Sequence, residues 1–229
     1  MRFHTIAATV LVFIAPAASC EVPPRPPLVP PEQAAKPVAS VALLNPGFES
    51  AAPGTVGAPQ GWLVGQHAGP PSYTFTHDAE APRTGNLSLR IDNIGPEPWG
   101  ALDQVIAATP LRGKTLRFSA WLRTRNAKGN AHGAGAGLAM QTKRGGYVVE
   151  QARMRVNAVV GTTDWARYEL HLHVANTADE IEVGVNLFGP GAVWIDDAAL
   201  DVVEPPPAPA SMPAAAADTA KPELQRVRP

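Results

Sequence analysis

Hydrophobic and polar residues alternate with a period of two in four separate segments of this chain. In residues 116–124, one face carries Leu116, Phe118, Ala120 and Leu122, and the other carries Arg117, Ser119, Trp121 and Arg123. The same alternation runs through 87–92, 167–174 and 181–188. A period of two is typical of half-buried β-strands, and no segment has a convincing helical period. The chain is therefore predicted to be all-β and antiparallel.

Turn-forming residues separate these segments, as expected for hairpins and corners. Short turn sequences that contain glycine occur at 45–47, 53–54, 84–86, 112–114, 145–146 and 189–191. About eight or nine strands are predicted, and long irregular loops between them favour a two-sheet jelly-roll sandwich over a closed barrel. The segment 129–137 is too rich in glycine for a strong strand, and we expect a mobile loop there.

Both ends of the chain have a different composition. Residues 1–19 read as a signal peptide, because Arg2 and His4 precede an apolar run at 6–15 that is too short to span a bilayer. The segment 20–40 and the tail 205–229 are rich in proline and alanine, so we expect a spacer and a disordered tail around one domain at 41–204.

Residues 17–20 resemble a bacterial lipobox, which implies a lipid anchor on Cys20. Ala17 stands where leucine is usual, so ordinary signal-peptide cleavage stays open as the alternative. Cys20 is the sole cysteine and cannot form an intramolecular disulfide. Glu21 follows it, and in lipoproteins of this kind that suggests the outer membrane. The chain is expected to be exported, and to reach a membrane only through such an anchor.

Charge and aromatic content narrow the possible partners. The formal net charge is −1 with no basic run, which argues against nucleic acid as a partner. Aromatic residues make up 6% of the chain, and five of them are tryptophans, which can serve packing or stacking.

Two acidic motifs bound the globular region: LLNPGFES at 43–50 and AVWIDDAALD at 192–201. Their positions suggest a sandwich in which the first and last strands meet. Between them lie Gly61-Trp62 and the segments 83–91, 111–124 and 162–174. In this order the motifs resemble the galactose-binding-like β-sandwich of carbohydrate-binding modules found with cellulases and xylanases. The resemblance covers 41–204 and implies non-catalytic carbohydrate binding.

The resemblance also implies a structural calcium ion. The matching carboxylates are Glu49 and either Asp196 or Asp197, with Asp196 favoured, and backbone carbonyls near Gly47 and the 83–86 turn would complete the hard oxygen ligands. Alternatively, these acids are solvated or cap turns.

A sugar site needs an aromatic plane for stacking and hydrogen-bonding groups beside it. Trp121 has this position by periodicity, and the same cleft could also be lined by Arg123, by Gln104, Gln141 and Asn186 from other strands, and by Trp99 and Tyr147 from loops. Trp121 could equally be a packing residue. Trp62, Trp165 and Trp194 are expected to be structural.

Catalytic signatures are weak. His171 and His173 share a strand face but have no third ligand at metal spacing, and there is no G-x-S-x-G motif. No second acid stands out for glycoside hydrolysis. The sequence therefore predicts an exported, non-catalytic glycan-binding module. The alternative is a structural or protein-interaction module of the cell envelope.

Overall fold

The computed structural model describes residues 37–51, 57–80, 82–154 and 157–204. Within these ranges the chain forms strands β1 to β11, and its only helical element is the short 3-10 helix η2 (Thr109–Leu111). The predicted signal peptide, the lipobox with Cys20 and the tail 205–229 lie outside the described residues.

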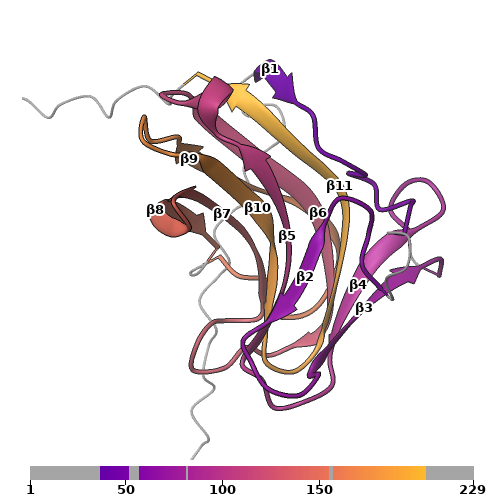
Figure 1. Ribbon diagram of the computed structural model, residues 1–229. Coiled ribbons are helices and arrows are strands. Elements are labelled where there is room, and N and C mark those ends of the chain that lie inside the picture. Colours follow the sequence, from indigo (N-terminus) through magenta and orange to yellow (C-terminus); the bar gives the residue numbers. More distant parts are fainter. Residues whose placement is uncertain (1–36, 52–56, 81, 155–156, 205–229) are drawn as a thin grey trace, which may run out of the picture.

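Two antiparallel sheets pack face to face (Figure 1). The first sheet has the order β3 (Tyr73–Asp78), β4 (Ser88–Asn93), β11 (Ala192–Val203), β6 (Thr115–Ala127) and β9 (Gly161–His173), and β1 (Pro37–Val41) also pairs with β11. The second sheet has the order β2 (Leu63–Gln66), β5 (Trp99–Ala107), β10 (Glu180–Phe188), β7 (Ala136–Arg144) and β8 (Tyr147–Arg153). The predicted all-β antiparallel sandwich is confirmed.

The core forms where the apolar faces of both sheets meet. All four apolar residues predicted for one face of β6 are fully buried: Leu116, Phe118, Ala120 and Leu122. From the second sheet, Leu102, Met140 and Ile181 are also fully buried in the same cluster. The polar residues that alternate with them therefore face outward on each sheet.

The first and last strands meet, as the acidic motifs suggested. Pro37 to Val41 pair along the end of β11, from Val203 to Leu200. The predicted domain start at Val41 is therefore too late by one strand, because the proline-rich composition before it concealed an edge strand. Proline is compatible with a strand edge, where its missing N–H breaks no ladder bond.

The glycine-rich segment 129–137 is more regular than expected. Strand β7 begins inside it, at Ala136. Before the strand, the side-chain oxygen of Asn130 accepts hydrogen bonds from the N–H groups of His132 (2.8 Å) and Gly133 (3.3 Å), and its Nδ2 donates to the carbonyl of Pro98 (2.6 Å). The predicted mobile loop is thus in part a strand and in part a turn held against the start of β5.

Candidate functional site

The outward face of the second sheet is hollow at its centre because small residues lie side by side there. Across the strands, Asp103 of β5 pairs with Gly184 of β10, which pairs with Ala139 of β7. In a neighbouring row, Ala101 pairs with Asn186. Side chains this short leave room between the taller residues on either side. We call this hollow the cleft.

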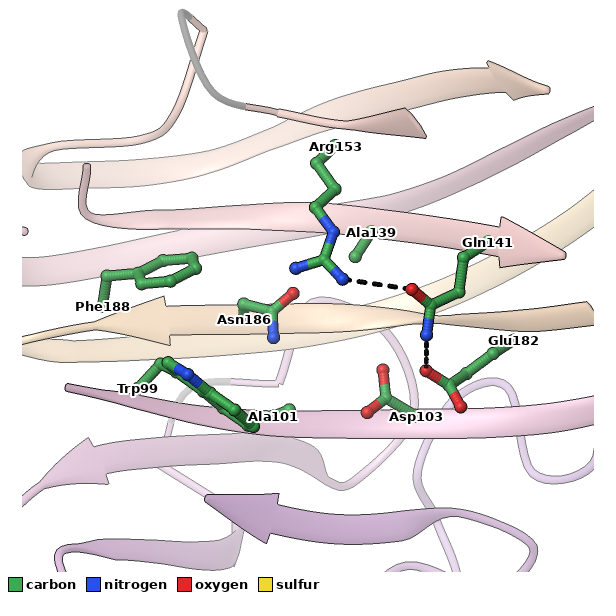
Figure 2. A pocket seen from close by; sticks show the side chains of 9 residues that line it. All are labelled: Trp99, Ala101, Asp103, Ala139, Gln141, Arg153, Glu182, Asn186 and Phe188. Atoms are coloured by element: carbon green, nitrogen blue, oxygen red, sulfur yellow. Dashed lines mark hydrogen bonds between the residues drawn. The ribbon is translucent and has the colours of Figure 1, made fainter. Parts of the chain in front are cut away.

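Two kinds of side chain enclose the cleft (Figure 2). Trp99 and Phe188, which pair across β5 and β10, stand at one end, and Gln141 and Glu182 stand at the other. Asn186 lies between the two ends. This part encloses about 200 Å³.

The cleft widens past its aromatic end. A second hollow of about 450 Å³ shares Trp99, Arg153, Asn186 and Phe188 with the first. It is also lined by the 130–134 turn and Met154. Together the two hollows form one continuous depression with an apolar side and a polar side.

At the polar end, four side chains form a continuous chain of charge-assisted hydrogen bonds. The guanidinium of Arg153 donates to the side-chain oxygen of Gln141 (3.1 Å), and the Gln141 amide donates to Glu182. The second Glu182 oxygen accepts from the ammonium of Lys143. Bonds of this kind fix the orientation of planar groups, so the polar end is preorganised.

Asp103 lies on the floor beside that chain but takes no part in it. Among the described residues, none donates a hydrogen bond to its carboxylate. Burial, together with the nearby negative charge of Glu182, raises the pKa of Asp103 to about 7, although the positive charges of Lys143 and Arg153 oppose the shift. A titratable acid therefore faces the cleft, and no hydrogen-bond donor from the described part of the chain stabilises its charge.

Three residues predicted for the sugar site line the cleft together: Trp99, Gln141 and Asn186. Trp99 was expected in a loop, but it is the first residue of β5. Strand pairing between β5, β10 and β7 brings these side chains to one face, which the sequence alone did not reveal.

Gln104 and Tyr147 lie away from this group. Gln104 lies on the opposite face of β5 from Asp103 and is buried. Its side-chain oxygen accepts a hydrogen bond from the backbone N–H of Leu44 (2.8 Å), and its Nε2 donates one to the Leu44 carbonyl (3.0 Å). Its role is to hold the segment after β1 against the sandwich. Tyr147 begins β8 after the Gly145-Gly146 turn rather than lying in a loop, and it is 82% exposed.

Trp121 and Arg123 belong to the first sheet, so the expected single cleft that joins them to Gln141 and Asn186 does not exist. The guanidinium of Arg83 covers the indole of Trp121 at 3.7 Å from its centroid. Arg123 lies over Trp194, at 5.4 Å. The outward position of Trp121 was predicted correctly, but its periodicity did not indicate that an arginine from a distant loop would occupy the ring face.

Three tryptophans were expected to be structural, and two of them are buried and hydrogen-bonded. Trp62 is buried against Phe48 and donates to the carbonyl of Leu44 (2.9 Å). Trp194 is buried on the outward side of the first sheet and donates to Asp78 (2.8 Å). Trp165 is only half-buried.

The candidate calcium ligand Asp196 is completely buried at a bulge in β11. Its carboxylate accepts hydrogen bonds from the N–H groups of Arg83 (2.9 Å), Thr84 (3.2 Å) and Asp197 (2.7 Å). Burial raises the pKa of Asp196, although these three donors oppose the shift. The 83–86 turn therefore presents N–H groups, rather than the expected carbonyls, to this acid.

Glu49 accepts hydrogen bonds in the same way where this turn ends. Its carboxylate accepts from the N–H groups of Asn86 (3.0 Å) and Leu87 (3.2 Å). Gly47 lies between the two acids: a Cβ there would be 3.9 Å from Asp196 Oδ1 and 4.0 Å from Glu49 Cγ. Within the described ranges, no group of three or more His, Cys, Asp or Glu residues could hold a metal. Two carboxylates beside Gly47 fit calcium in part, and backbone carbonyls would have to supply the other ligands.

Sequence reasoning did not select Asp103, Arg153, Glu182 and Phe188. Arg153 and Glu182 each lie between two apolar residues, and Asp103 follows Leu102, so all three resemble ordinary solvent-facing positions. One signal was available in β10, whose outward set is Glu182, Gly184, Asn186 and Phe188. A glycine inside a strand often marks a place where another group approaches closely.

No protein-family model matches this chain. Among curated proteins, it is similar to the uncharacterized HTH-type transcriptional regulator YbfP of Bacillus subtilis strain 168, with 28% identity over 151 residues. That match covers 63% of this chain and 48% of the relative, so the chain spans about half the length of the curated relative it matches. The described residues contain no α-helix, and hence no helix-turn-helix.

Among solved structures, the chain is similar to the enzymatically active domain of tailspike protein 4 from bacteriophage CBA120. The TM-score is 0.51 at 15% identity, over 72% of this chain and 22% of that one. TmCBM61, solved with β-1,4-galactotriose, gives a TM-score of 0.46 at 18% identity, over 70% of this chain and 97% of that one. Similarities this distant concern the fold, and the function has to be argued from the cleft.

Proposed function

We propose that this protein binds a glycan non-catalytically in the cleft of the second sheet. The observation that carries the proposal is the combination of Trp99 and Phe188 at one end with Asn186, Gln141 and Asp103 beside them. A pyranose ring has an apolar face and a rim of hydroxyls, so it requires both kinds of surface close together.

Each residue of the cleft is suited to a different contact with the sugar. The Trp99 indole offers a flat surface for a sugar ring, and its position at the end of the sheet leaves it half-exposed. The amide of Asn186 can both donate to and accept from hydroxyls, while the Asp103 carboxylate can accept from them. Arg153 and Gln141 are already oriented by their mutual hydrogen bond, so a ligand would need to order few side chains.

The test is retention of the protein on insoluble polysaccharides, measured as depletion from solution at pH 8. Cross-linked xylan, galactan and mannan and microcrystalline cellulose form a suitable panel. We expect saturable retention on one class and none on uncharged cross-linked polyacrylamide beads, which carry no sugar. Folded protein that remains in solution with every member of the panel would refute glycan binding and favour the alternative, a protein partner in the cell envelope.

A second candidate function is acid catalysis, favoured by the pKa of Asp103 near 7. An acid that is half-protonated near neutral pH is suited to donate a proton. Incubation with the retained polysaccharide distinguishes the two candidates. Binding alone predicts no new reducing ends, whereas catalysis predicts their steady release and its loss in the Asp103→Asn variant.

We further propose that Glu49 and Asp196 hold a structural calcium ion beside Gly47. The ion would join the segment after β1 to the β11 bulge, so chelation should lower the melting temperature of the wild type. The Glu49→Gln variant should have a lower melting temperature without chelator and should lose the sensitivity to it. Equal melting curves with and without chelator would contradict calcium binding.

Export and lipid anchoring through Cys20 are also proposals, based on the first twenty residues. None of the described residues belongs to a helix long and apolar enough to cross a membrane. Expression in a Gram-negative host should give a membrane-associated wild type and a soluble, exported Cys20→Ser variant. Persistent membrane association of that variant would exclude a lipid on Cys20.

A further inference from the structure

Asp103 occupies the centre of the cleft floor because its neighbour on β10 has no side chain. It pairs with Gly184 on one side and with Leu63 of β2 on the other. A Cβ on residue 184 would lie 2.4 Å from Asp103 Oδ1 and 2.0 Å from the carbonyl oxygen of Leu102. The glycine is thus required for the carboxylate to lie where it does.

Every charged group that faces Asp103 is already engaged elsewhere. Glu182 from β10 is bonded to Gln141 and to Lys143 from β7, and Arg153 from β8 is bonded to Gln141. On the other side, β2 (Leu63–Gln66) contributes no charged residue. The cations lower the proton affinity of Asp103 from a distance, but neither donates a hydrogen bond to it.

A bound ligand would change this situation. A half-buried carboxylate needs hydrogen-bond donors, and a sugar ring resting on Trp99 would bring its hydroxyls close to Asp103. The sugar hydroxyls donate more strongly to Asp103 when it is ionised, because a protonated carboxyl is a weaker acceptor. Hydrogen bonds to a charged acceptor are roughly twice as strong as those between neutral groups.

We propose that Asp103 is the specificity-determining acceptor for ligand hydroxyls and that ligand binding is coupled to loss of its proton, so that the cleft releases its glycan on acidification. This inference rests on the proposed glycan-binding function.

The size of the effect follows from the fraction of ionised Asp103. With half-ionisation near pH 7, that fraction falls on the order of 100-fold between pH 8 and pH 5. A ligand that binds only the ionised form should lose affinity by the same factor. A ligand that tolerates the neutral acid in part should lose less, and we expect at least about a tenfold loss.

Two other ionisable side chains near the cleft, both histidines, serve as controls. His132 lines the wide end of the depression, and His67 is bonded to Glu97 (3.0 Å) with its ring 6.0 Å from that of Trp99. The variants His132→Gln and His67→Gln remove these imidazoles without changing the floor. The variant Asp103→Asn keeps the shape of the floor but removes its titration.

The experiment measures retention on the four polysaccharides named above at pH 5, 6, 7 and 8. We expect retention of the wild type to fall at least about tenfold from pH 8 to pH 5. Both histidine variants should keep that dependence, whereas Asp103→Asn should bind weakly and equally at every pH. A second measurement needs no ligand: the side-chain carboxyl of Asp103, followed by carbon NMR in the free protein, should titrate near neutral pH.

The contrary outcomes separate the two proposals. Retention that is independent of pH, or equally dependent on pH in Asp103→Asn, overturns the coupling and leaves glycan binding intact. An Asp103 carboxyl that titrates below pH 5 also overturns the coupling alone. Absence of retention on every polysaccharide at pH 8 overturns glycan binding, and the coupling with it.

Discussion

Replacement of Trp99 by alanine is expected to reduce polysaccharide retention by about tenfold or more. Trp99 and Phe188 provide the aromatic end of the cleft, and the indole is the larger of the two ring systems. Loss of stacking worth about 1.4 kcal/mol or more corresponds to at least that factor in affinity. Depletion isotherms on the retained polysaccharide measure it directly.

Trp121 provides a matched control on the other sheet. Its ring is covered by Arg83, so Trp121→Ala should leave retention unchanged while it lowers stability modestly through loss of that contact. Trp99→Phe keeps an aromatic plane and should bind with intermediate affinity. Equal retention by wild type and folded Trp99→Ala, with loss of retention in Trp121→Ala, would move the site to the first sheet.

The Asp103→Asn variant is expected to be more stable than the wild type at pH 8, by roughly 1–3 kcal/mol of unfolding free energy. In the folded protein the pKa of Asp103 is about 7, above the ordinary value of 3.8. Between pH 3.8 and about pH 7, Asp103 is protonated to a greater extent in the folded state than in the unfolded state. The stability of the wild type is therefore not reduced by Asp103 below about pH 4, and this stability is lost as the pH rises through 7.

Urea unfolding at pH 5, 6.5 and 8 measures this effect. The difference between variant and wild type should grow with pH and then level off above about pH 8. Asp164→Asn is the control, because Asp164 is exposed on β9 and the same substitution there should change little. If the variant is no more stable than the wild type at pH 8, ionisation of Asp103 does not destabilise the folded state and the prediction is wrong.

The strands could be predicted from the sequence because the alternation of apolar and polar residues within each strand reflects which of its faces is buried. The alternation in 116–124 identified the face of β6 that packs into the core, and every apolar residue of that face is buried. The edge strand β1 was missed because Pro37 and its neighbours are exposed and show little alternation. Its position depends on pairing with β11, which is distant in sequence.

The cleft was harder to predict because it depends on strand order and register. Trp99, Gln141 and Asn186 were recognised as suitable for sugar binding, but only the order β5-β10-β7 brings them together. Trp121 has the same outward pattern in its own strand, yet it lies on the other sheet. Single-strand periodicity indicates which side of a sheet a residue faces, not which residues from other strands stand beside it.

Asp103 illustrates the same limit for electrostatics. In sequence it is a polar residue between Leu102 and Gln104 and resembles an ordinary solvent-facing acid. Its raised pKa comes from the surrounding cleft and from Glu182, which is placed nearby by the pairing of β5 with β10. The glycine at 184 was the local sign that this part of the sheet is unusual.

The most direct test of the central claim is the location of a bound oligosaccharide by NMR chemical-shift mapping. A soluble oligomer of the retained polysaccharide should shift the indole Nε1–H of Trp99 and the side-chain amides of Gln141 and Asn186, and the indole of Trp121 should not move. Shifts that concentrate on Trp121 and Arg123, with the signals of Trp99, Gln141 and Asn186 unchanged, would contradict a binding site in the cleft of the second sheet.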